Sequence, residues 1–116
     1  MKKTMFIEVN TQFEFFHKWE NAPEEVGFLR NLHRHDFLVT CQIEVYHNDR
    51  ELEFFMVLHR LESFINDELK HMPATTSCEQ FCEKIGEFLI ETYGNRNLMI
   101  KVSEDGKSAS IMNYEV

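Results

Sequence analysis

The sequence contains no block of basic residues that could track a nucleic acid. Its 12 Lys and Arg are scattered among 20 Asp and Glu, which gives a formal net charge of −8. A phosphate-backbone binder needs clustered positive charge, because neutralising phosphates supplies most of its affinity. We therefore expect no nucleic-acid partner.

A long apolar run is also missing. The first ten residues, MKKTMFIEVN, carry charge on both sides of their short apolar stretch. Neither a signal peptide nor a membrane span is built in this way. We expect a cytoplasmic protein with no membrane partner.

The cysteines do not form a pairing or C-x-x-C pattern. There are three, Cys41, Cys78 and Cys82, and the last two are four residues apart. An odd count with this spacing does not suggest a disulfide framework. We interpret all three as reduced, partly buried small hydrophobic residues.

The chain is rich in large apolar residues for its size. Eleven Phe and six Met occur in 116 residues, and 43% of the residues are hydrophobic. No repeat, low-complexity tract or Gly/Ser linker interrupts the chain, so we predict a single domain over residues 1–116. A domain this small leaves much apolar surface exposed, which favours a homo-oligomer.

Two segments alternate apolar and polar residues with a period of two. In residues 5–17 most odd positions are apolar while the even ones include Glu8, Asn10, Gln12 and Glu14, and residues 33–45 follow the same parity. Such alternation predicts two strands, each with one buried face.

The middle of the chain changes to helical spacing. Between Asn48 and Met72, apolar residues recur every three or four positions, which predicts an amphipathic helix. The residues of this stripe are Phe54, Leu58, Leu61, Ile65 and Leu69. Ser77 and Gln80 have the spacing of a capping box at the start of a second helix, and Gly94 suits its end.

Alternation returns near the C-terminus. Leu98 to Glu104 predicts a third strand, Asp105-Gly106 a tight turn, and Ser108 to Glu115 a fourth strand. The order β-β-α-α-β-β predicts an α+β domain with two helices on one face of a four-stranded antiparallel sheet.

Three histidines are expected to meet at one end of this sheet. The connection from Lys18 to Leu32 is 15 residues long, and loops of that length in small domains are often functional. If the first two strands are antiparallel, His17 at the end of one lies beside His33 and His35 at the start of the other. All three share the buried parity.

Three imidazoles with an open fourth position form a catalytic zinc arrangement. Nitrogen ligands suit Zn²⁺ better than Mg²⁺ or Ca²⁺, which prefer oxygen. The alternative is that His33 and His35 are only polar residues at the start of a strand, because short motifs of this kind also occur without a metal.

Glu104 is a charged residue at a position where the alternation of the third strand predicts an apolar one. It continues the apolar row of the third strand, so its carboxylate points to the core side at the strand end. A buried carboxylate needs a donor partner. Either the strand ends early and Glu104 lies in water, or Glu104 accepts two N–H donors from a heterocyclic ligand.

Four stretches of the chain match motifs of one enzyme family. FEFFH (13–17) ends the first strand, and LHRHDF (32–37) stands where that family usually has Leu-His-Gly-His. TSCE (76–79) is similar to the family's Pro-Thr-x-Glu, and IKVSED (100–105) to its Val-x-Val-x-Glu-Thr. In this order, and over nearly its whole length, the chain resembles the 6-pyruvoyl- and 6-carboxy-tetrahydropterin synthases.

The resemblance implies the T-fold, in which subunits close their sheets into a barrel as a trimer or hexamer. It also implies that the three histidines hold Zn²⁺ and that Glu104 anchors a pterin ring, helped by backbone and hydroxyl groups around Thr76 and Ser77. The implied activity is that of a carbon–oxygen lyase acting on dihydroneopterin triphosphate or a related pterin.

Two departures fall on the acid/base residues. Leu29 takes the place of the family's catalytic cysteine, and Lys70-His71 takes the place of its Asp-His pair. His71 is then the remaining catalytic proton carrier, without its orienting carboxylate. The alternatives to an enzyme are a non-catalytic zinc-containing protein that binds a pterin or guanine nucleotide, and a zinc-stabilised oligomer without a ligand.

Overall fold

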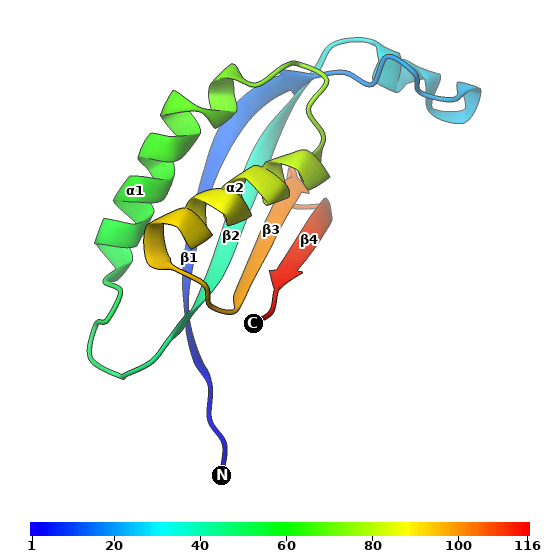
Figure 1. Ribbon diagram of the computed structural model, residues 1–116. Coiled ribbons are helices and arrows are strands. Elements are labelled where there is room, and N and C mark those ends of the chain that lie inside the picture. Colours follow the sequence, from blue (N-terminus) through cyan, green and yellow to red (C-terminus); the bar gives the residue numbers. More distant parts are fainter.

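The computed structural model describes residues 1–116 as a four-stranded antiparallel sheet covered on one face by helices (Figure 1). The sheet order is β1-β2-β3-β4, the same as the order along the chain. Its strands are β1 (Met5–His17), β2 (His33–Val45), β3 (Leu98–Glu104) and β4 (Ser108–Tyr114). The helices are α1 (Phe54–Asp67), α2 (Cys78–Tyr93) and the short 3₁₀ segments η1 (Glu24–Arg30) and η2 (Leu69–His71).

This arrangement confirms the predicted α+β class and the antiparallel four-stranded sheet. The two long strands begin and end where the alternation does, and β4 ends one residue earlier than predicted, at Tyr114. Helix α1 is shorter than the interval from Asn48 to Met72 in which it was predicted. Neither α-helix contains a stretch apolar and long enough to cross a bilayer.

The predicted start and end of α2 are confirmed by its caps. The Ser77 hydroxyl accepts a hydrogen bond from the backbone N–H of Gln80, and the Gln80 side chain accepts one from the backbone N–H of Ser77. Gly94, with a φ of 86°, ends the helix in a conformation that residues with a Cβ rarely adopt. These caps set the position of Cys78, the first residue of α2.

The turn between β3 and β4 also forms as predicted. Asp105 and Gly106 have positive φ values of 57° and 76° and form the centre of a tight turn, which the backbone N–H of Lys107 closes by donating to the carbonyl of Glu104 at 3.1 Å. The backbone N–H of Asp105 donates to the carbonyl of Asp36 at 2.8 Å. The turn is thereby tied to the start of β2, where the histidines lie.

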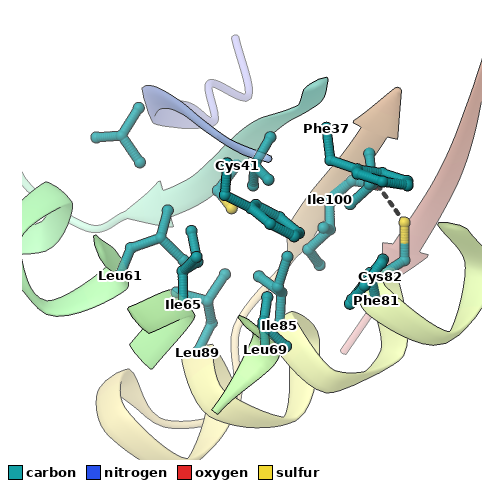
Figure 2. Packing of buried hydrophobic residues seen from close by; sticks show 14 of the residues in the cluster. Phe37, Cys41, Leu61, Ile65, Leu69, Phe81, Cys82, Ile85, Leu89 and Ile100 are labelled. Carbon is teal, nitrogen blue, oxygen red and sulfur yellow. Dashed lines mark hydrogen bonds between the residues drawn. The ribbon is translucent and has the colours of Figure 1, made fainter. Parts of the chain in front are cut away.

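The core lies between the sheet and the two α-helices (Figure 2). At the end nearest His17 it consists of four phenylalanines, whose ring centroids are 5.1–6.4 Å apart: Phe13, Phe15, Phe37 and Phe81. Phe37 is fully buried, and its ring centroid lies 5.2 Å from that of His17 and 5.9 Å from that of His35. These aromatic rings therefore form the base on which two of the histidines rest.

The buried stripe of α1 differs at its start from the predicted one. Val57, Leu61 and Ile65 are buried, whereas Phe54 is 56% exposed. Phe54 begins the helix and borders a hollow shared with Met5 and Ile7 at the edge of the core. A residue with the right helical phase remains exposed there, because the core does not extend beneath the first turn.

Replacing Phe37 tests how strongly the aromatic base supports the fold. We expect Phe37→Ala to lower the free energy of unfolding by about 3–5 kcal/mol, because it leaves a cavity among well-packed rings. The matched control is Phe55→Ala, since Phe55 is 77% exposed and should change stability by less than about 0.5 kcal/mol. Chemical denaturation measures both, and equal effects would contradict this description of the core.

Candidate metal centre

The three histidines converge at one end of the sheet. The antiparallel register of β1 and β2 pairs His17 with His33 and Phe15 with His35. One ring nitrogen from each histidine lies within 4.8 Å of those of the other two. The strand parity seen in the sequence thus brings all three imidazoles to one point, as predicted.

Each imidazole is held through its Nδ1 atom by a hydrogen-bond acceptor. His17 Nδ1 lies 3.2 Å from the carbonyl of Thr76, and His33 Nδ1 lies 2.8 Å from the carbonyl of Asn31. His35 Nδ1 lies 2.7 Å from Oδ2 of Asp105. Because these partners can only accept, Nδ1 carries the proton and the lone pair is left on Nε2.

This pattern fits a metal ion. Metal-binding histidines usually donate their other N–H to a carbonyl or carboxylate, which fixes the tautomer and orients the ring. Burial lowers the pKa of His17, which favours the neutral form that can act as a ligand. Three imidazoles held in this way could bind a divalent transition-metal ion.

A cavity of about 460 Å³ opens beside the histidines. It lies between the end of β1, the loop after it, the start of α2 and the end of β3. Its lining residues are His17, Lys18, Trp19, Leu29, His33, Thr75, Thr76, Ser77, Cys78, Glu79 and Glu104. This size suits a small organic ligand.

The predicted ligand residues Thr76 and Ser77 lie in the wall of this cavity, but both also serve the fold. The Thr76 hydroxyl donates to the carbonyl of Pro73 at 2.6 Å, and the Thr76 carbonyl holds His17. The Ser77 hydroxyl accepts from Gln80, which leaves its own O–H free to donate to a ligand.

Glu104 ends β3 with its carboxylate directed at the histidines rather than into open water. Oε1 is 3.8 Å from Nε2 of His17, and Oε2 is 3.3 Å from Nε2 of His35. The side chain is 34% exposed. Glu104 thus borders both the cavity and the imidazole cluster.

Cys78 is a site residue that the sequence analysis missed. Its thiol lines the cavity and donates to Oε1 of Glu104 at 3.7 Å. Burial, with the nearby Glu104 carboxylate, raises the pKa of Cys78 to about 12, so the thiol is protonated at neutral pH. The sequence could have indicated this role, because Cys78 directly follows Ser77, which was predicted to cap α2 and to bind a ligand.

Leu29 and His71 occupy very different places. Leu29 lines the cavity, at the position where the resemblance leads one to expect a cysteine. His71 ends η2 and borders a separate hollow between α1 and α2, with Phe64 and Phe88 among its neighbours. Within one chain, His71 therefore does not line the cavity beside the other three histidines.

Comparison with known proteins adds no relative. No model of a known protein family matches the chain, and a search of curated proteins finds no match.

The contact between His35 and Asp105 provides a test of the metal centre. We expect Asp105→Asn to lower the affinity for Zn²⁺ by about 10- to 100-fold, because a neutral amide holds the imidazole less well than a carboxylate. Asn tolerates the positive φ of this position, so the turn should remain intact.

Competition with a chromophoric chelator measures the affinity. Asp49→Asn is the control, since Asp49 is exposed and its side chain pairs only with Arg50. Unchanged affinity in Asp105→Asn would show that the contact does not serve a bound metal.

Proposed function

We propose that the protein is a zinc-dependent lyase similar to the tetrahydropterin synthases, acting on dihydroneopterin triphosphate or a related pterin. The observation that carries this proposal is the set of three imidazoles, each held through Nδ1, beside a cavity bordered by a carboxylate. The sequence resemblance supplies the ligand class.

Zn²⁺ at the three histidines would supply Lewis-acid polarisation of a ligand hydroxyl or carbonyl. The protein residues then have separate tasks. Glu104 accepts N–H donors from the 2-amino-4-oxo edge of the ring, and the free O–H of Ser77 donates to the ligand. Thr76 keeps His17 in place through its carbonyl.

The proton carrier in this proposal is His71 of a neighbouring copy. His71 does not line the cavity of its own chain, so only another copy can bring one there. The outer edges of β1 and β4 have no strand partner within the chain, and unpaired edges are available for pairing between copies. We propose a trimer or hexamer in which sheets join along these edges.

The alternative is a non-catalytic zinc-containing protein that binds a pterin or guanine nucleotide. Guanine and pterin share the 2-amino-4-oxo edge that a carboxylate can recognise. Leu29 at the cavity wall favours this alternative, because an aliphatic side chain cannot transfer a proton. The thiol of Cys78 is a poor replacement base, given its pKa of about 12.

Incubating the zinc-loaded protein with dihydroneopterin triphosphate separates these two functions. The lyase predicts release of triphosphate at a rate proportional to enzyme concentration, and loss of that release in His33→Ala, which lacks a metal ligand. Phosphate analysis and chromatography of the pterin measure the reaction. Tight pterin binding without triphosphate release, at high protein concentration, would overturn the lyase and support the binding protein.

Mixing two inactive variants tests the origin of His71. We expect His17→Ala and His71→Ala each to lose triphosphate release. After unfolding and refolding together they should recover about a quarter of wild-type activity, since one site in four then combines an intact His17 with an intact His71 from its neighbour. No recovery, with mixed oligomers verified by mass spectrometry, would contradict a shared site.

A further inference from the structure

Glu104 lies at the distance from the histidines that a fellow metal ligand would have. In a tetrahedral site with metal–ligand bonds of 2.0–2.1 Å, ligand atoms are about 3.3 Å apart. Oε2 of Glu104 is 3.3 Å from Nε2 of His35, and Oε1 is 3.8 Å from Nε2 of His17. One metal ion could therefore contact the Glu104 carboxylate together with both imidazoles.

The hydrogen bonds of His35 make this contact chemically informative. Its Nδ1 donates to Asp105 at 2.7 Å, which turns Nε2 toward the Glu104 carboxylate. A ring nitrogen and a carboxylate oxygen lie this close when a proton or a metal cation is between them. His17 faces the same carboxylate with its Nδ1 also bonded to an acceptor. A single proton can bridge only one of these two pairs, whereas one metal cation shared by both imidazoles and the carboxylate satisfies all three groups.

The surroundings of Glu104 hold the carboxylate toward the histidines. The Cys78 thiol donates to Oε1 at 3.7 Å and leaves Oε2, the oxygen nearer His35, without a protein donor. His17 and His33 line the cavity but His35 does not. Glu104, which does line the cavity, is in contact with the Nε2 atom of His35.

We propose that Glu104 is the fourth metal ligand in the ligand-free protein, so that the resting centre is a closed His₃Glu site. An incoming molecule with a metal-binding hydroxyl or carbonyl gains the fourth position only by displacing Glu104, whose side chain is partly exposed and free to swing into the cavity. The displaced carboxylate can then accept N–H donors from a heterocycle. This inference rests on the metal site of the proposed function but not on the identity of its organic ligand.

The test uses protein loaded with Co²⁺ and no organic ligand, because the visible absorption of Co²⁺ reports the number and type of its ligands. We expect Glu104→Ala and the isosteric Glu104→Gln to change the band positions and intensity of the bound Co²⁺. We also expect both to lower the affinity for Zn²⁺ at least about tenfold in chelator competition. This is no less than the loss of affinity that follows when a residue holding a metal ligand is replaced. Glu79→Gln is the matched control, since Glu79 lines the same cavity but hydrogen-bonds Ser110. An unchanged spectrum and affinity in both Glu104 variants, with folding verified by circular dichroism, would overturn the proposal.

Cys78 is a positioning residue in this scheme and offers a second measurement. Cys78→Ala should shift the Co²⁺ spectrum in the same direction as Glu104→Gln but less, because Glu104 loses a hydrogen-bond donor but still reaches the metal. Cys78→Ser, which keeps a donor, should restore the wild-type spectrum. A Cys78→Ala spectrum identical to that of wild type would remove Cys78 from the scheme.

Failure of this inference can be told apart from failure of the proposed function. If the wild type binds no pterin and releases no triphosphate, but the Glu104 variants alter the Co²⁺ spectrum, the fourth-ligand assignment stands and the pterin assignment falls. If the wild type binds a pterin but the Glu104 variants leave the Co²⁺ spectrum unaltered, the pterin assignment stands and the fourth-ligand assignment falls. Stoichiometric metal retained by His33→Ala at wild-type affinity overturns both.

Discussion

The antiparallel register between β1 and β2 is the constraint on which the candidate site depends. Thirteen consecutive residue pairs run from Met5 opposite Val45 to His17 opposite His33. A slip of one residue would turn every side chain of one strand to the other face of the sheet. The apolar rows prevent such a slip, because it would expose the buried Phe13 and Phe15. The burial of phenylalanines therefore also determines where the histidines point.

The polar groups of the site are supplied by segments that are distant in sequence. Thr76, just before α2, holds His17, while Asp105, in the turn after β3, holds His35. Each of these acceptors is itself fixed by local structure: the turn requires a positive φ at Asp105, and the capping box sets the start of α2. The imidazoles are consequently oriented before any metal binds, which reduces the ordering cost of binding.

The metal-binding and proton-transferring parts of the proposed site differ in how complete they are within one chain. The three histidines, their acceptors and Glu104 all come from the same copy. His71 borders another hollow, and the cavity wall has Leu29 and a protonated Cys78 beside the carboxylates of Glu79 and Glu104. In the proposed lyase, the proton carrier His71 therefore has to come from another copy. The proposed His₃Glu resting state, by contrast, uses only residues of one chain, and its carboxylate would leave the metal when a ligand replaces it.

Periodicity and turn chemistry were sufficient to predict most of the fold. Alternation predicted β1 and β2 to the residue, and the Ser77–Gln80 box and Asp105-Gly106 predicted a helix start and a hairpin. These features are local, because a cap or a tight turn involves only residues within a few positions of each other. The exposure of Phe54 was missed since helical phase does not reveal how far the core extends beneath a helix.

The sequence by itself also determined that His17, His33 and His35 share one end and one face of the sheet, because strand parity and antiparallel pairing follow from the residue order. Only the tertiary structure decided which atoms hold them, that Cys78 reaches Glu104, and that Glu104 faces two imidazoles while His71 does not share their cavity. Apart from the bond between His33 and Asn31, those contacts join residues at least 26 positions apart in the sequence. They depend on how α2 and the β3–β4 turn pack against the end of the sheet, and no local pattern encodes that packing.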